Sequence, residues 1–272
     1  MGLRDMRRKD PSWGTGSRFF LPNEDAGMVR EAISLLEKDP VSSIFVGGSG
    51  FLVTEAVRSL PETSGVTFVD ISTFQVEYFR EFLEALEASG SPKQLREWFS
   101  KMVYPRLRDH FLEVRNSLYR EDQVFGAMEL LFQVRFFFEE EPFRQAKRAM
   151  SSVKVVRDDI VNYMERGAQR QDFIYLSNVM DYIPPERLDD LLGRCGSAGA
   201  AVYALLTETC ADRGAVSDAV DRAGYTVHPG STDLSFRNRG LGSHSLDRSW
   251  NRKGEILFLI PPRQTLGRED IR

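Results

Sequence analysis

Apolar and polar residues follow two different rhythms along this chain. Segments with apolar residues three or four positions apart, the spacing of amphipathic helices, cover 26–38, 50–59, 73–88, 160–166, 185–194 and 211–223. Short apolar runs typical of buried strands lie at 43–47, 66–70, 153–156, 173–177, 200–206, 224–228 and 255–260. Because strands alternate with helices, the pattern predicts an α/β fold with a seven-stranded, mostly parallel, Rossmann-like sheet covered on both faces.

Two departures from this rhythm refine the prediction. The last two strands are joined by a polar stretch, 229–254, without an evident helix, so the final strand is expected to run antiparallel to its neighbour. Residues 91–150, after the second strand–helix unit, show helical periodicity but no strand. We interpret them as a helical insertion that serves as a substrate-binding element or lid. We expect 41–90 and 151–272 to form the Rossmann-like domain, and 1–40 to supply a tail and a helix that cover its site.

Within the insertion, the segment 132–139 is unusually aromatic. Its side chains are expected to form the buried face of an inserted helix. The alternative is that they line an apolar acceptor pocket or contact lipid.

A glycine cluster at the end of the first predicted strand is the most informative motif. Gly47, Gly48 and Gly50 allow the backbone to turn sharply and to approach a ligand closely. Asp70 ends the second strand, where a carboxylate can accept hydrogen bonds from two ribose hydroxyls. The dinucleotide-binding pattern of three glycines fails, because Val53 stands at the third position. The motif therefore indicates a nucleoside-containing cofactor that is not a dinucleotide.

Polar residues also follow the third and fourth predicted strands. They are the pair Asp158 and Asp159 and the pair Ser177 and Asn178. Ligands of such sheets bind outside the carboxyl ends of the strands, so all these residues are expected at one edge. Each has a structural alternative: Asp70, Asp158 or Asp159 can cap the helix that follows it.

Taken in this order, the motifs resemble the class I methyltransferase fold, whose members use S-adenosyl-L-methionine (SAM). The resemblance implies SAM as the cofactor. It places the glycine loop beside the methionine and ribose parts, an acid after the second strand on the ribose, an acid and the next backbone N–H at the adenine, and the fourth strand end beside the methionine. The residues that it assigns to SAM are Gly47, Gly48, Gly50, Asp70, Ile71, Asp159, Ile160, Ser177 and Asn178.

The insertion and four short segments are also similar to a narrower family, the 3-amino-3-carboxypropyl transferase that makes the headgroup of betaine lipids from SAM and diacylglycerol. The matching segments are 20–25, 68–75, 176–182 and 247–249. This resemblance implies transfer of the 3-amino-3-carboxypropyl group of SAM to an acceptor. Methyl transfer is the first alternative, and a non-catalytic SAM-binding or interaction protein is the second.

A general base is needed only where the acceptor is protonated. Asp181 and Tyr182 follow the fourth strand and are the first candidates for this role, with Glu24 as a further one. Asp25 and Arg248 are candidates to hold the substrate. The structural alternatives are helix capping for Glu24 and Asp25, packing for Tyr182 and a surface salt bridge for Arg248.

The composition of the chain restricts the classes of partner and cofactor that we expect. The chain has 272 residues with a net charge of −4, which gives no reason to expect nucleic acid. A small-molecule or lipid-like acceptor is expected, and lipids, amines, small metabolites and protein side chains all stay open. Two cysteines without a CxxC pattern and three scattered histidines favour neither a disulfide framework nor a metal site. Neither a membrane span of about 20 apolar residues nor a signal peptide is evident. The cysteine pattern suits a reducing compartment, so we expect a cytoplasmic protein. The oligomeric state is not predicted.

Overall fold

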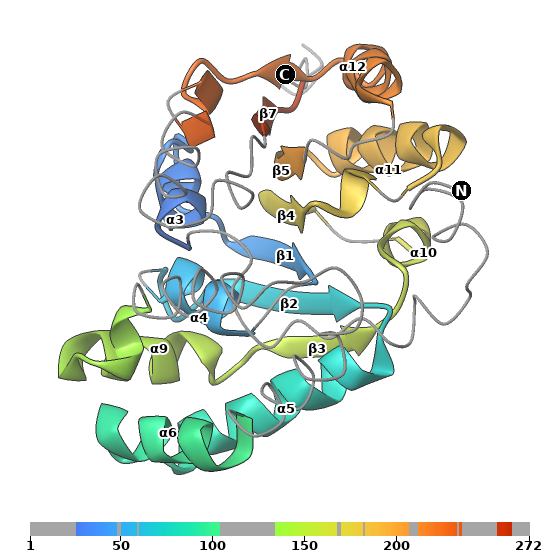
Figure 1. Cartoon of the computed structure of the whole chain (residues 1–272). Coiled ribbons are helices and arrows are strands. Elements are labelled where there is room, and N and C mark those ends of the chain that lie inside the picture. The colour runs from blue at the N-terminus through green and yellow to red at the C-terminus, as the bar shows by residue number, and fades with distance from the viewer. Residues whose placement is uncertain are drawn as a thin grey trace, which may run out of the picture.

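In the computed structural model of the protein, seven strands form one sheet in the order β3-β2-β1-β4-β5-β7-β6 (Figure 1). The structure describes residues 26–47, 50–58, 60–103, 134–167, 170–181, 183–206, 212–232, 234–235 and 255–262. The strands are β1 (Ser42–Val46), β2 (Gly65–Asp70), β3 (Lys154–Arg157), β4 (Phe173–Ser177), β5 (Ala201–Leu206), β6 (Thr226–Val227) and β7 (Glu255–Ile260).

Neighbouring strands from β3 to β5 pair in parallel, whereas β7 runs antiparallel between β5 and β6. The predicted fold class, a seven-stranded and mostly parallel sheet with an antiparallel last strand, is confirmed. β6 is shorter than the predicted strand at 224–228. Beyond it, the hydroxyls of Ser231 and Ser235 accept the backbone N–H groups of Phe258 and Ile256, at 3.0 and 2.8 Å, and so satisfy the edge of β7.

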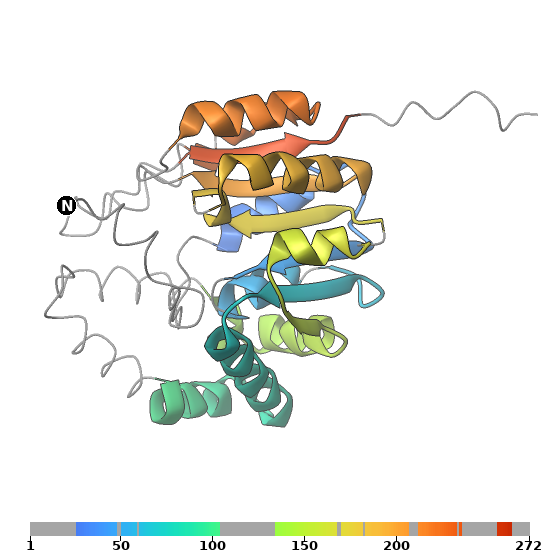
Figure 2. The same ribbon diagram turned by 90° about the vertical axis from the view of Figure 1, so that its right-hand side faces the viewer.

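Helices cover both faces of this sheet (Figures 1 and 2). One face carries helices that come before β3 in the chain, and the opposite face carries those that follow β3, β4 and β5. The helices on the first face are α3 (Ala26–Ser34), α4 (Gly50–Val57), α5 (Thr73–Ala88) and α9 (Glu140–Met150). Those on the second are α10 (Ile160–Glu165), α11 (Pro185–Ser197) and α12 (Arg213–Arg222). α3 ends four residues earlier than the predicted helix at 26–38.

The two faces of the sheet carry different side chains. Because successive residues of a strand point to opposite faces, each strand contributes to two separate cores. The face under α3, α4 and α5 is rich in rings, including Phe45, Phe68 and Tyr175. The face under α10, α11 and α12 is aliphatic, including Ile44 and Val69.

The described part of the insertion is helical, as predicted. It packs on the aromatic side of the molecule and consists of α6 (Pro92–Trp98), the π-helical turn η1 (Phe99–Val103), the 3-10 turn η2 (Arg135–Phe137) and α9. In the described part of the aromatic segment, residues 134–139, the chain forms the 3-10 turn η2 rather than an α-helix. Phe136 and Phe137 are buried, while Phe138 is 45% exposed. The expected burial is confirmed for these two rings, and the expected helix is wrong for residues 134–139.

Candidate functional site

The carboxyl ends of β1, β2 and β3 bring Gly47, Asp70 and Asp158 side by side. In the sheet register, Val46 pairs with Val69 and Asp70 with Arg157. Backbone bonds continue one step beyond the strands, since the N–H of Gly47 donates to Val69 O and the N–H of Asp158 donates to Asp70 O, both at 3.0 Å. The sequence prediction that these residues share one edge is confirmed.

The two described glycines of the loop have different physical roles. Gly47 has a φ of 67°, a left-handed conformation that favours glycine, and a Cβ there would lie 3.5 Å from Asp70 Oδ2. Gly50 begins α4, and a Cβ there would lie 2.1 Å from Cδ2 of Phe79. Gly50 is therefore required for close packing of α4 on α5, whereas Gly47 is the described glycine beside the acid. Gly48 lies outside the described residues.

Asp70 is the electrostatic centre of this edge. Its Oδ1 accepts the backbone N–H of Ser72 at 2.7 Å, the one hydrogen bond to this carboxylate within the described part of the chain. Burial raises the pKa of Asp70 to about 6, and the Ser72 bond lowers it only partly. Ser72 itself caps α5 by accepting the N–H of Gln75, so Asp70 is not the cap residue. A partly buried acid with so little compensation is typical of a ligand-binding position.

Ile71 follows Asp70 directly and is 51% exposed. Single exposed apolar residues are common and carry little meaning alone. Here the side chain adjoins the acid at the carboxyl end of β2, where the resemblance expects a cofactor residue.

The two acids after β3 behave differently. The carboxylate of Asp159 caps α10, with Oδ1 accepting the N–H groups of Val161 at 2.8 Å and Asn162 at 3.4 Å. Both of its oxygens also accept the guanidinium of Arg187 in α11, at 3.2 Å each. Asp158 accepts the N–H of Asp159 through Oδ1 and forms an ion pair with Arg166 through Oδ2. The helix-capping alternative therefore describes the Asp159 side chain.

Ile160, which was also assigned to the cofactor, begins α10. Its side chain is buried in the aliphatic core, with 5% exposed.

The end of β4 has an unusual backbone. Ser177 has a φ of 49°, the one non-glycine residue of the described chain with a positive φ, and the register with β5 shifts between Tyr175 and Ser177. Ser177 is buried, and its hydroxyl lies 3.5 Å from Asn178 Oδ1. Strained residues and bulges persist where the surroundings hold them, often at binding sites. The left-handed backbone of Ser177 could not be predicted from the sequence, because serine rarely adopts this conformation.

The expected catalytic and substrate residues are only partly placed. Asp181 ends the 3-10 turn η3 (Val179–Asp181), directly beyond β4, so the backbone brings it to the same edge of the sheet. Tyr182, Glu24, Asp25 and Arg248 lie outside the described residues.

The described residues contain no group of three or more His, Cys, Asp and Glu residues that could hold a metal ion. None of their helices is long and apolar enough to cross a membrane.

Sequence reasoning did not identify the buried acid of α4, Glu55, or its arginine partners. A single acid inside an otherwise apolar helix, GFLVTEAV, was the available signal. Arg187 was missed as well, since nothing local marks an arginine 28 residues away as a partner of Asp159.

No protein-family model and no curated protein matches this chain. Several solved structures match this chain, with low sequence identity and low TM-scores. StiE O-MT has a TM-score of 0.47 at 10% identity, over 88% of this chain and 74% of that one. A TehB-like SAM-dependent methyltransferase from Corynebacterium glutamicum has 0.43 at 9%, over 96% and 97%. The plantazolicin methyltransferase BamL, in complex with a triazolic desmethylPZN analog and SAH, has 0.43 at 11%, over 87% and 82%.

This chain spans about half the length of two other matching structures of O-methyltransferase type, 52% and 55% of their chains. Identities and scores of this size transfer no activity to this chain. The fold assignment therefore stands on the sheet itself, whose order and antiparallel last strand agree with the class I methyltransferase fold predicted from the sequence.

Proposed function

We propose that this protein is a SAM-dependent transferase. The observation that carries the proposal is Asp70, a partly buried carboxylate beside the left-handed Gly47 with a pKa raised to about 6. A buried charge is costly unless it is hydrogen-bonded. Two ribose hydroxyls would donate the hydrogen bonds that this carboxylate lacks among the described residues, and each such bond to a charged group is worth about 1.5–3 kcal/mol.

The rest of the edge fits the other parts of SAM. Ile71 offers an exposed apolar side chain to the adenine face. Because the Asp159 carboxylate caps α10 and its N–H donates to Asp158, we assign the side-chain contact to the adenine amino group to Asp158, in exchange for its ion pair with Arg166. The backbone contact is assigned to the N–H of Ile160. The strained end of β4 at Ser177 and Asn178 is assigned to the methionine part.

The reaction follows from where the acceptor is held. When bound, SAM supplies a sulfonium whose attached carbons are electrophilic. The residues of the chain place the acceptor in line with one of these carbons and exclude water, and placement of this kind supplies most of the acceleration of a displacement. We assign 3-amino-3-carboxypropyl transfer as the reaction, because of the insertion after the second strand–helix unit, and methyl transfer as the alternative.

The acceptor is a small molecule or lipid-like compound in this proposal. Asp181, Tyr182 and Glu24 are the candidates to take a proton from a hydroxyl or ammonium acceptor. Asp25 and Arg248 are the candidates to hold the acceptor, and a guanidinium suits a carboxylate or phosphate.

Mass spectrometry of the nucleoside product tests the proposal. The purified protein is incubated with SAM and a panel of amine, hydroxyl and lipid acceptors, with Asp70→Asn as the matched control. Methylthioadenosine formed by the wild type alone supports aminocarboxypropyl transfer, and S-adenosylhomocysteine supports methyl transfer. SAM binding without either product would favour the non-catalytic alternative, and absence of SAM binding would overturn the proposal.

A further inference from the structure

The helix that follows the glycine loop contains a buried acid. Glu55 is the one charged residue of α4, and only 1% of it is exposed. All eight residues of α4 are buried, so this charge is held within packed, mostly apolar surroundings. A carboxylate in such a place is stable only when cations and hydrogen-bond donors surround it.

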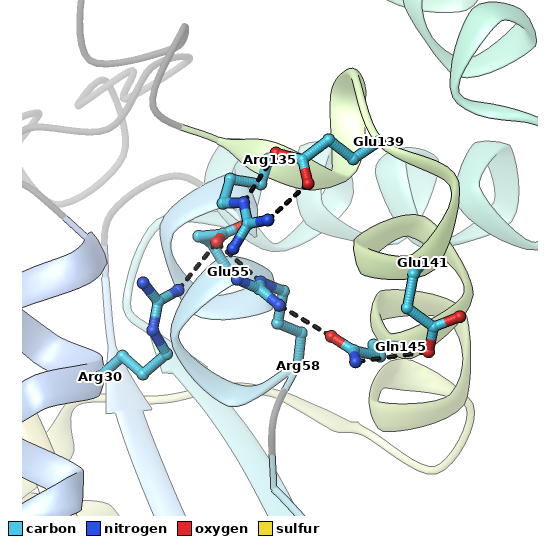
Figure 3. Close-up of polar contacts among 7 residues, drawn as sticks. All are labelled: Arg30, Glu55, Arg58, Arg135, Glu139, Glu141 and Gln145. Atoms are coloured by element: carbon cyan, nitrogen blue, oxygen red, sulfur yellow. Dashed lines mark hydrogen bonds and ion pairs between the residues drawn. The ribbon is translucent and has the colours of Figure 1, made fainter.

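Two arginines pair with the same oxygen of Glu55 (Figure 3). Oε1 accepts Nε of Arg58 at 2.7 Å and Nη1 of Arg30 at 2.8 Å. Arg30 belongs to α3, and Arg58 follows α4 directly. Nη1 of Arg58 also donates to Oε1 of Gln145 in α9 at 2.7 Å. One continuous chain of polar contacts therefore joins α3, α4 and the last helix of the insertion.

The second oxygen of Glu55, Oε2, is buried and accepts no hydrogen bond within the described part of the chain. Figure 3 shows the guanidinium of Arg135, from η2, close to the Glu55 carboxylate. Arg135 pairs with Glu139, which is the largest cause of its raised pKa, and the charge of Glu55 contributes as well. The insertion thus brings a third cation near the same buried acid.

The ion pairs of Glu55 fix the position of a helix that begins close to Gly47. α4 begins only three residues after Gly47, and its first residue is fixed against Phe79 by the missing Cβ of Gly50. A displacement of α4 therefore moves Gly50 relative to Gly47, the glycine beside Asp70. Charge-assisted hydrogen bonds are short and directional, so those to Oε1 of Glu55 fix the position of α4 against α3.

We propose that Glu55 is a positioning residue for the SAM site, which clamps α4 to α3 and α9 and so couples the glycine loop to the insertion. This inference rests on the proposed function. The proposed role of Glu55 predicts that SAM affinity depends on residues that do not contact SAM. It also predicts that SAM binding changes the hydrogen exchange of the α9 amides. A coupling of this kind changes affinity by about 5–150-fold.

Calorimetric titration with SAM tests the first consequence. Glu55→Gln keeps the shape of the side chain and removes its charge, and it is expected to weaken SAM binding about tenfold. Val220→Ala, a buried position of α12 in the aliphatic core, is the control, because it lowers Tm without touching the cluster. Arg30→Gln alters a partner that is 33% exposed, so it is the variant to use where Glu55→Gln does not fold, and about fivefold weaker binding is expected.

Hydrogen exchange tests the second consequence. SAM is expected to slow exchange of the α9 amides in the wild type and to leave them unchanged in Glu55→Gln or Arg30→Gln. Wild-type SAM affinity in Glu55→Gln and Arg30→Gln would overturn the coupling, and so would an equal loss of SAM affinity in Val220→Ala. Exchange rates of the α9 amides that do not change when SAM binds would overturn it as well. A wild-type protein that does not bind SAM at all would instead overturn the proposed function, and this is established before any variant is measured.

Discussion

The two faces of the sheet differ in how their helices are held. The aromatic face packs ring against ring and buries the Glu55 carboxylate, with only 2% of the Glu55 side chain exposed. The aliphatic face packs branched side chains, and its charges pair at the surface. Arg194 and Glu165 are an example, at 3.7 Å with 42% and 43% exposed.

The difference between the two faces follows from the position of the insertion. The insertion docks on the aromatic face through rings from η1 and η2, while the opposite face carries three helices in the ordinary strand–helix succession. Aromatic pairs add about 0.5–1.5 kcal/mol each beyond the area that they bury. Surface ion pairs add about 0–1 kcal/mol. The two faces should therefore respond differently to substitution.

The largest effect is expected from the ring that connects the insertion to α4. Phe51 lies with its ring centroid 4.9 Å from that of Phe82 and 5.1 Å from that of Phe137. Phe51→Ala should lower the free energy of unfolding by about 4 kcal/mol in urea titrations, and Leu192→Ala on the other face by about 3 kcal/mol. Hydrogen exchange in α9 should rise far more in Phe51→Ala. Equal exchange in both variants would mean that Phe51 does not anchor the insertion.

The next effect contrasts buried with exposed charge. Glu55→Gln leaves Arg58 buried beside a neutral side chain, so the free energy of unfolding should fall by about 3 kcal/mol. Glu165→Gln, which removes the surface pair with Arg194, should change it by no more than about 0.5 kcal/mol. Chemical denaturation of both variants at one pH measures the contrast. Similar small losses would show that the Glu55 pairs contribute little.

Asp70 gives a smaller effect of opposite sign. Its folded pKa of about 6 lies above the value near 3.9 of an unfolded aspartate, so the folded state holds the proton more tightly. Its contribution to stability is therefore present below about pH 4 and is lost as the pH rises through about 6. At pH 7.5, Asp70→Asn should stabilise the ligand-free protein by about 2 kcal/mol and flatten the dependence of stability on pH between 4 and 6. A destabilised variant would contradict the raised pKa.

The smallest effect separates the two acids after β3. Asp159→Ala removes the cap of α10 and should cost about 1 kcal/mol of stability while leaving SAM affinity within about twofold. Asp158→Ala should weaken SAM binding about fivefold, because it removes the assigned side-chain contact to the adenine. Calorimetry and thermal unfolding of both variants measure the difference. If Asp159→Ala alone loses SAM affinity, the adenine contact belongs to Asp159.

Local sequence determined most of the fold. The bounds of β4, β7 and α5 coincide with the predicted segments 173–177, 255–260 and 73–88, because hydrophobic periodicity is strong there. The antiparallel last strand followed from the missing helix before it. The 3-10 turn at η2 was not predictable, since its phenylalanines are fixed by rings of α4 and α5 that are distant in sequence.

The candidate site was predictable in composition but not in detail. The strand ends supplied Gly47, Asp70 and the acids after β3, because parallel strands finish at one edge. Which of Asp158 and Asp159 caps α10 depends on their backbone angles and on Arg187, and neither can be read locally. The partners of Glu55 were hidden for the same reason, since Arg30 lies 25 residues away.

The most direct test of the account is the affinity for SAM, measured by calorimetry at pH 7.5 and pH 5 for the wild type and Asp70→Asn. With a pKa of about 6, only about one tenth of Asp70 is ionised at pH 5. The wild type should therefore bind SAM about tenfold more weakly at pH 5. Asp70→Asn should bind weakly at both pH values without this dependence. A wild type that does not bind SAM, or an Asp70→Asn variant that binds it as well as the wild type at pH 7.5, would contradict the proposal that this edge holds SAM through Asp70.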